Sequence, residues 1–340
     1  MAHLTHFRSA PVVAAAFDKI HAPKGSERID GDREGRVSGC GQANVPTLLF
    51  QDGLRRERAT INGSLPLGQP RPFQFMTPIS IIIPCYNGAA TLARALQSCL
   101  IQPEAAQIIV VDDGSTDASA ELVAHYGRLD PRVCLLQMPY NGGPARARNW
   151  GAMHAAHGLL AFLDADDEYM PGALAAACVF LTQNPKEISV RLDVDYADFP
   201  GDIIHHPDFD KHAATLSNTV PSSLIIRRAV YAALGGFPMD DAFRRIGGED
   251  GAFSWALREI FGNRRLDDAK RVRMHYHAGI HAERYFRIAL GLRAPDPTDM
   301  ADAFRLSRQF LDTALAGIEQ LRTASLAAEA AASSLPNRAA

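Results

Sequence analysis

Residues 79–88 are ISIIIPCYNG, residues 107–116 are QIIVVDDGST and residues 159–167 are LLAFLDADD. In each of these segments, a short run of mostly apolar residues leads directly into polar residues. Continuous apolar runs of this length are typical of strands that are buried on both faces of a sheet. The three segments therefore predict three strands of one buried sheet, with the polar side chains placed where the strands end.

Helical patterns fill the intervals between these strands. Residues 91–100 place their apolar side chains on one helical face, with Thr91 as the predicted cap, and further helices are predicted at 115–126 and 145–157. Another strand is predicted at 133–137. Strands that alternate with helices indicate right-handed crossovers and a parallel sheet. The predicted fold class is therefore α/β, with a mostly parallel Rossmann-like sheet that is flanked by helices.

The composition limits the class of protein. The chain has 340 residues, of which 47% are hydrophobic and 21% are charged, and its formal net charge is -3. These values exclude a mostly disordered chain, and they provide no overall basic field, so we expect no nucleic-acid partner. The five cysteines are scattered and have no CxxC spacing, which suits buried thiols in a reducing compartment. No apolar stretch approaches the length of a transmembrane helix, and we expect a cytoplasmic protein.

Both ends of the chain differ from its middle. Residues 1–76 form a predicted extension and linker with more basic than acidic side chains, in which 10–17 predict the start of a helix and 47–50 predict a short strand. Residues 296–340 form a predicted helical tail with an apolar stripe between residues 304 and 321. The stripe predicts packing on the domain or on a second copy of the chain. Peripheral contact with a membrane is the alternative, with weak electrostatic support.

Polar residues follow the predicted strands at their carboxyl ends, where open parallel sheets bind ligands. Asp113 can accept a hydrogen bond from a nucleotide base or cap a helix, and Tyr86 offers a ring face on which the same base can stack. Asp164 and Asp166 present two carboxylates to one opening. This pair suits Mg²⁺ or Mn²⁺ completed by phosphate oxygens, and a solvated acidic loop is the alternative.

Two further segments contain candidate site residues. The glycine-rich turn at 141–143 opens a helix in which Arg146 and Arg148 cannot share a face, so that one can reach a ligand while the other is solvated. Glu249 and Asp250 follow two glycines at the start of an apolar helix, either as functional acids or as acids that favour the helix dipole. Neither a Walker A loop nor a GxGxxG turn follows the first strand, which disfavours kinase and nicotinamide-cofactor functions.

The sequence near residue 275 is rich in basic and histidine side chains. His275, His277 and His281 lie within seven residues, and one of them is predicted to be a ligand, although no cysteine or HExxH motif supports a zinc site. The preceding basic cluster at residues 264–273 predicts a solvated loop. Binding of a phosphate-bearing or acid-bearing acceptor by this cluster is the alternative.

Seven segments, in their order and spacing, resemble glycosyltransferase family 2, whose members have the GT-A fold. These segments are SIIIPCYNGAATLARALQSCL, IIVVDDGSTDAS, NGGPARARNWGA, AFLDADDEYMPGAL, SSLIIRRAVYAALGGF, GGEDGAFSWALR and HYHAGIHAERYF. The resemblance covers residues 78–290. It implies that residues 77–200 bind a nucleotide-sugar and that residues 201–295 bind the acceptor and carry the catalytic acid. The divergent extension at 1–76 and the tail at 296–340 have no counterpart.

The resemblance also implies roles for individual residues. Asp250 deprotonates the acceptor hydroxyl, and Glu249 beside it orients the acceptor or the sugar. Asp166 and His277 hold the metal ion, Mn²⁺ or Mg²⁺. The implied contacts to the nucleotide-sugar are Pro84, Tyr86, Asn87, Asp113, Arg148, Asp164, Ala165 and Asp166.

The function implied by the resemblance is inverting, metal-dependent transfer of a sugar from a UDP-sugar to a hydroxyl of a carbohydrate or glycoconjugate acceptor. Many family members use lipid-linked acceptors. The expected location is therefore the cytoplasm, including the inner face of the membrane. Two alternatives stay open, a sugar nucleotidyltransferase and a non-catalytic nucleotide-sugar-binding domain. The first is disfavoured because the loop CYNGAAT after the first strand has no basic residue, and the second because the acidic motifs are intact.

Overall fold

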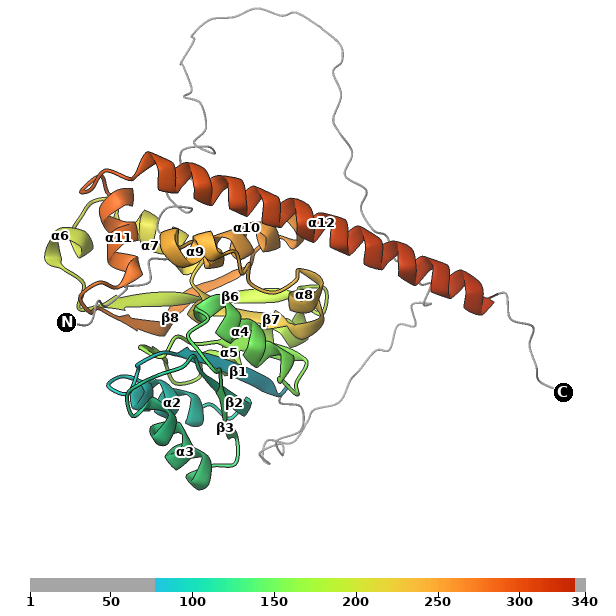
Figure 1. Cartoon of the computed structure of the whole chain (residues 1–340), viewed down its shortest axis with the longest axis horizontal. Helices are drawn as coiled ribbons and strands as arrows, with labels where there is room; N and C mark the ends of the chain where they lie inside the picture. The colour runs from blue at the N-terminus through green and yellow to red at the C-terminus, as the bar shows by residue number, and fades with distance from the viewer. Residues whose placement is uncertain (1–76, 334–340) are drawn as a thin grey trace, which may run out of the picture. The chain divides into compact units, whose positions relative to one another are not determined.

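The computed structural model describes residues 77–333, whose strands form one eight-stranded sheet with helices on both faces (Figure 1). The strand order is β3-β2-β1-β4-β7-β6-β8-β5, and four of the seven pairings within these residues are parallel. The strands are β1 (Ile79–Cys85), β2 (Ala105–Asp112), β3 (Val133–Gln137), β4 (Leu159–Phe162), β5 (Asp167–Tyr169), β6 (Ser189–Ala197), β7 (Leu224–Arg227) and β8 (Arg265–His275). The predicted α/β fold class is confirmed.

The helices cover the sheet in two layers. One layer packs on the face of β1 that presents Ile81 and Ile83, and the other on the face that presents Ile82. The continuous apolar run of β1 follows from this burial on both sides. The helices are α2 (Leu92–Leu100), α3 (Ser119–Leu129), α4 (Pro144–Met153), α5 (Ala173–Gln183), α6 (Gly201–Ile204), α7 (Phe209–Ser217), α8 (Arg228–Ala233), α9 (Asp241–Ile246), α10 (Glu249–Phe261), α11 (His281–Ala289) and α12 (Pro297–Ser333), with a 3₁₀ turn η1 at Pro221–Ser223.

The first two predicted helices differ in detail from the observed ones. Thr91 precedes α2, but its side chain makes no capping hydrogen bond to that helix. Helix α3 begins four residues later than predicted, because side-chain oxygens from two strand ends hold the chain in a turn. The Asp112 carboxylate accepts a hydrogen bond from the Ser115 amide, and the Asn87 side chain accepts one from the Thr116 amide. The backbone of residues 115–116 is therefore committed to the turn.

The basic cluster at 264–273 is not the predicted solvated loop, since it forms most of strand β8. Its cations are paired with acidic side chains. Lys270 forms an ion pair with Asp193, and Arg273 forms one with Asp195. Cross-strand pairing with β6 brings opposite charges together, so the segment can join the sheet. These pairings leave little free positive charge for an acidic acceptor.

The first part of the predicted tail packs on the domain. Helix α12 runs along α10, and Trp255 of α10 stacks on Phe304 (Figure 1). Ala303, Leu306, Leu311 and Ala314 of α12 are buried, whereas residues 319–326 are exposed. Packing on a second copy or on a membrane stays a prediction.

Some expectations fall outside the part of the chain that the structure describes. These are the helix start at 10–17, the strand at 47–50 and the linker up to residue 76. Of the helices in residues 77–333, none combines the length and the apolar character needed to cross a membrane. Three of the four cysteines in this part are buried, and all four are free thiols.

Candidate active site

The largest cavity of the site, about 450 Å³, opens at the carboxyl ends of β1, β2 and β4. The structure brings to this one cavity all eight residues that the sequence predicts to contact a nucleotide-sugar, together with His277. We call it the donor cavity. The predicted residues that line it are Pro84, Tyr86, Asn87, Asp113, Arg148, Asp164, Ala165, Asp166 and His277.

A second cavity of about 90 Å³ contains the predicted catalytic acids, and we call it the acid cavity. Glu249 and Asp250 line it together with Asp167 and with an apolar wall that includes Val220 and Ile280. The residues that line both cavities are Arg148, Asp164, Asp166 and His281. The two cavities therefore meet at the Asp-x-Asp segment.

The loop after β1 owes its shape to contacts with the loop after β2. Asn87 has a positive φ of 51°, and its amide donates to the Ser115 hydroxyl at 2.9 Å. Asparagine tolerates this left-handed conformation better than most residues. A side chain at Gly88 would bring its Cβ within 2.9 Å of the Cys85 sulfur. The loop leaves Tyr86 46% exposed, so its ring is accessible to a ligand.

Asp113 holds the glycine-rich turn in place. Its carboxylate accepts hydrogen bonds from the amides of Gly142 at 2.6 Å and Gly143 at 2.8 Å. Burial raises its pKa to about 6, although these two bonds act in the opposite direction. Asp113 does not cap a helix, because α3 begins at Ser119. A nucleotide base would have to share an oxygen that already accepts a backbone hydrogen bond.

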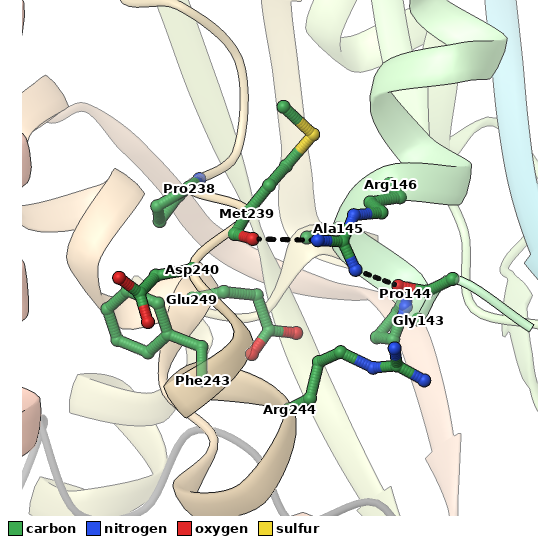
Figure 2. A pocket seen from close by; sticks show the side chains of 11 residues that line it. Gly143, Pro144, Ala145, Arg146, Pro238, Met239, Asp240, Phe243, Arg244 and Glu249 are labelled. Carbon is green, nitrogen blue, oxygen red and sulfur yellow. Dashed lines mark hydrogen bonds between the residues drawn. The ribbon is translucent and has the colours of Figure 1, made fainter.

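The two arginines of α4 point in different directions, as their spacing predicts. The guanidinium of Arg148 is buried and lies 2.6 Å from the Asp164 carboxylate and 3.6 Å from that of Glu249. Arg146 turns away to Asp241 and to the carbonyl oxygen of Met239 (Figure 2). Arg148 therefore links the donor cavity to the acid cavity, whereas Arg146 fastens α4 to the segment that precedes α9.

A third and smaller cavity, about 30 Å³, lies between the glycine-rich turn and the segment 238–244 (Figure 2). Arg244 of α9 donates to the backbone oxygen of Asn141 at 3.1 Å. Glu249 also lines this cavity. Glu249 thus borders both the acid cavity and the contact between the glycine-rich turn and α9.

Asp166 and His277 face one another at the mouth of the donor cavity, 2.9 Å apart. Burial alone would raise the pKa of Asp166, but the hydrogen bond and the charge of His277, together with a backbone hydrogen bond and the charge of Arg94, lower that pKa. The same bond raises the pKa of His277. His275 instead contacts Glu168 at 3.0 Å, so the predicted histidines do not converge on one point.

Residues 77–333 contain no group of three or more His, Cys, Asp or Glu side chains arranged around a metal position. A carboxylate and an imidazole at a cavity mouth nevertheless fit a Mn²⁺ or Mg²⁺ ion that takes its other ligands from substrate phosphates and water. The donor set of Asp166 and His277 is of this kind.

Glu249 and Asp250 occupy the first turn of α10 after Gly247 and Gly248, whose φ angles are 80° and 99°. Both side chains are buried. Burial raises the pKa of each, and the neighbouring Glu249 carboxylate raises that of Asp250 further, while Arg148 opposes the shift. Two acids that only complement a helix dipole would be expected in solvent, so their burial against a cavity favours a chemical role.

The sequence prediction does not include three residues at or beside the acid cavity, which are Asp167, Ser222 and Arg191. Asp167 is fully buried in the acid cavity, where the Ser222 hydroxyl donates to its carboxylate at 2.6 Å and accepts from the Asp164 amide at 3.0 Å. Arg191 is buried behind the same cavity. Its position between Val190 and Leu192 is a signal that could have identified it, because a buried strand rarely contains a cation without a purpose.

The fold resembles that of a solved glycosyltransferase. The crystal structure of S. aureus TarS 1-349 in complex with UDP-GlcNAc aligns with a TM-score of 0.52 and 20% identity, covering 68% of this chain and 66% of that chain. At this identity the likeness concerns the fold alone, and it confirms the predicted GT-A fold.

Sequence comparisons find relatives of the central part of the chain. Residues 80–224 match the model of Glycosyl transferase family 2. Over 98 residues the chain is 43% identical to the succinoglycan biosynthesis protein ExoU of Rhizobium meliloti, which is 29% of each protein. Over 110 residues it is 41% identical to an uncharacterized glycosyltransferase of Haemophilus influenzae, covering 32% of this chain and 44% of that protein. The matches span less than half of these relatives.

Residues 80–224 of this chain are therefore similar to glycosyltransferase family 2. The family that this segment matches is the one that the sequence resembles.

Proposed function

We propose that the protein transfers a sugar from a UDP-sugar to a hydroxyl group of a carbohydrate or glycoconjugate acceptor, with inversion at the anomeric carbon. One observation carries this proposal. The donor cavity and the acid cavity meet at Arg148, Asp164 and Asp166, so that a donor in the first cavity can face a nucleophile in the second. A cytoplasmic location, extended to the inner face of the membrane, belongs to the same proposal.

The donor cavity provides the contacts for a nucleoside diphosphate. Its volume of about 450 Å³ lies in the range of small-molecule sites. The exposed ring of Tyr86 offers a stacking surface for uracil, and Asp113 fixes the adjacent glycine-rich turn by its two backbone hydrogen bonds.

Asp166 and His277 would hold the divalent cation, Mn²⁺ or Mg²⁺, at the mouth of the donor cavity. When bound, such an ion neutralises the charge that develops on the departing diphosphate. Arg148 contributes a fixed positive charge on the same side, where Asp164 and Glu249 orient its guanidinium. Because Arg148 is buried, its field is weakened less by solvent than that of a surface arginine.

Asp250 is the general base of the proposed reaction. Its raised pKa makes it a stronger proton acceptor than an ordinary carboxylate, because a base works best with a pKa near the working pH. A single base that activates the acceptor hydroxyl opposite the leaving group leads to inversion. Glu249 is closer to Arg148 and orients the sugar or the acceptor.

The apolar side of the acid cavity suits the acceptor. Leu216, Val220 and Ile280 form a wall across from the carboxylates. A sugar ring has apolar C–H faces and polar edges, and a cavity with one apolar and one acidic side can receive both. The acidic side and the paired charges of β8 favour a neutral acceptor group at this position.

The test is the release of UDP from a panel of UDP-sugars in the presence of Mn²⁺ or Mg²⁺, with and without simple sugar acceptors. The proposed function predicts UDP release that requires the metal and is lost in Asp250→Asn. Release of pyrophosphate from a sugar phosphate and a nucleoside triphosphate would indicate a nucleotidyltransferase instead. Binding of UDP-sugars without any product release across a broad acceptor panel would indicate a binding domain.

A further inference from the structure

Arg191 is a buried cation near the start of strand β6. Its side chain is 1% exposed and is among the largest fully buried side chains of the described residues. It forms no ion pair with another residue in the range 77–333, in contrast to Arg148, which has two carboxylates beside it. A buried charge without an ionic partner lowers stability unless hydrogen bonds and a nearby opposite charge compensate it. The position of Arg191 therefore calls for a functional explanation.

The hydrogen bonds of Arg191 join two walls of the acid cavity. One guanidinium nitrogen, Nη1, donates to the carbonyl oxygen of Val220 at 2.9 Å and to the Ser223 hydroxyl at 3.1 Å. The other, Nη2, donates to the Ser254 hydroxyl at 2.7 Å. Val220 lines the cavity, and Ser254 lies four residues after Asp250 on the same face of α10. The guanidinium of Arg191 thus contacts α10 one helical turn after Asp250.

The same 3₁₀ turn extends this connection to the donor cavity. Ser223 contacts Arg191, while its neighbour Ser222 bonds both the Asp164 amide and the Asp167 carboxylate. A short turn is a stiff spacer between adjacent residues. Arg191 therefore fixes the position of α10 relative to the turn that holds the Asp-x-Asp segment.

The charge of Arg191 has a second consequence, because it interacts with the carboxylate of Asp250. Two of the surrounding groups are arginines, while burial lowers the pKa of His281 to about 4 and leaves its imidazole neutral. Arg148 is shared between Asp164 and Glu249. Asp250 is the charged group that favours the protonated form of Arg191 against the effect of burial. The charged or titratable groups that face Asp250 are Glu249, Arg148, Asp164, Asp167, Arg191 and His281.

We propose that Arg191 is a positioning residue of the transfer reaction, which sets the spacing between Asp250 and the Asp-x-Asp segment and favours the ionised form of Asp250. This inference rests on the proposed function, in which Asp250 is the base. It adds a residue outside both cavities to the set that determines the rate. The guanidinium touches neither donor nor acceptor and acts only through Asp250, Ser254 and the turn at 220–223.

The experiment compares variants that separate the charge from the hydrogen bonds. Arg191→Lys keeps the charge and loses the planar fork, whereas Arg191→Met keeps much of the volume and loses both. Arg191→Gln is the second neutral variant, in case Arg191→Met does not fold. The matched control is Arg227→Met, because Arg227 also donates to backbone carbonyl oxygens but lies at the end of the neighbouring strand β7, beside Leu159 and outside both cavities.

In Arg191→Met we expect kcat to fall by at least about tenfold while the KM for the UDP-sugar changes little. In a plot of kcat against pH, the acid limb should move to higher pH by about one unit, since loss of a nearby positive charge disfavours the ionised carboxylate of Asp250. In Arg191→Lys the limb should return toward its wild-type position while kcat stays reduced. Arg227→Met should lower the melting temperature without moving the limb.

A measurement without turnover keeps this inference separate from the proposed function. The carboxyl carbon of Asp250 can be titrated by NMR and assigned through Asp250→Asn. A higher pKa of Asp250 in the neutral Arg191 variants supports the inference, even when the wild type releases no UDP. Absence of UDP release would refute only the proposed function. Folded neutral variants with unchanged kcat and an unchanged Asp250 titration would overturn it, as would an equal shift in Arg227→Met.

Discussion

The donor cavity and the acid cavity adjoin one another, yet their side chains experience opposite environments. The donor cavity is wide and presents solvent-accessible groups, with Tyr86 46% exposed and the Asp166 side chain 34% exposed. In the acid cavity Glu249 and Asp250 are 4% and 5% exposed. The pKa of Asp166 is lowered by its histidine partner, whereas burial raises that of Asp250. Accessible groups suit reversible ligand binding, and desolvated groups suit proton transfer.

The largest expected effect lies in the acid cavity. In Asp250→Asn the side chain keeps its shape but cannot accept a proton, so turnover should fall by about 10²–10⁴-fold while UDP affinity changes little. The melting temperature should stay equal or rise at neutral pH. Because burial raises the folded-state pKa of Asp250 to about 8, ionisation favours the unfolded chain above the ordinary carboxyl pKa, and Asn removes this loss of stability.

Glu249→Gln is the matched control, because it alters the adjacent buried acid. We expect a smaller loss of turnover, through weaker orientation by Arg148. Turnover, UDP affinity and melting should be measured for both variants. Near-normal turnover in Asp250→Asn would exclude it as the base and leave Glu249 as the candidate. Asp241 is a weaker one, since its side chain is 78% exposed and paired with Arg146.

The next largest effect concerns the donor cavity. Asp166→Ala should abolish the metal-dependent part of nucleotide-sugar binding, and His277→Ala should weaken it by roughly 10-fold. Binding of a UDP-sugar is measured by calorimetry with Mn²⁺, with Mg²⁺ and with excess chelator. His275→Ala is the control, since His275 contacts Glu168 and does not line either cavity. Full activity of the wild type in chelator would remove the metal from the mechanism and leave Asp166 as a sugar contact.

The difference between the cavities also explains what the sequence could predict. The donor cavity is built from loops at strand ends, so apolar runs followed by Tyr86, Asp113 and Asp164 located it from local pattern alone. The acid cavity is assembled from distant segments, and nothing local pairs Arg191 with Ser254 or Ser222 with Asp167. Those contacts are set by the order of β6 and β7 in the sheet, which a single sequence does not specify.

The same distinction applies to the fold. Strands β1 to β4 have uniform apolar runs and were predicted nearly to their ends, whereas β8 has four Lys and Arg side chains and was predicted as a loop. Its charges are neutralised by Asp193, Asp195 and other acids that lie far away in the sequence. Local polarity is therefore a poor guide where partners come from another strand.

A smaller effect sharpens the description of the donor cavity. Tyr86 and Asp113 should favour uracil, so UDP should raise the stability of the protein more than GDP, CDP or ADP at equal concentration. By mass action, UDP at 100 times its dissociation constant should add about 2.7 kcal/mol to the free energy of unfolding. Thermal shifts with the four nucleotides in Mn²⁺ check this order. Stronger protection by GDP would contradict the uridine assignment without affecting the fold.

The smallest expected effect concerns the pair of Asp166 and His277 in the metal-free protein. Its hydrogen bond raises the pKa of His277 above the ordinary 6.5, so the stabilisation from that side is complete below this value and is lost as the pH rises through the raised pKa. It lowers the pKa of Asp166 below the ordinary 3.8, so the stabilisation from that side is present above this value and is lost as the pH falls through the lowered pKa. The pair therefore contributes between these two limits.

Both side chains are partly exposed, 34% for Asp166 and 50% for His277, so solvent screening limits the contribution to about 0.2–1 kcal/mol. In chelator, the stability difference between the wild type and His277→Gln should shrink as the pH rises through the range above about 6.5, and added salt should reduce it. A difference that is constant across this range would show that the two side chains do not form an ion pair in solution.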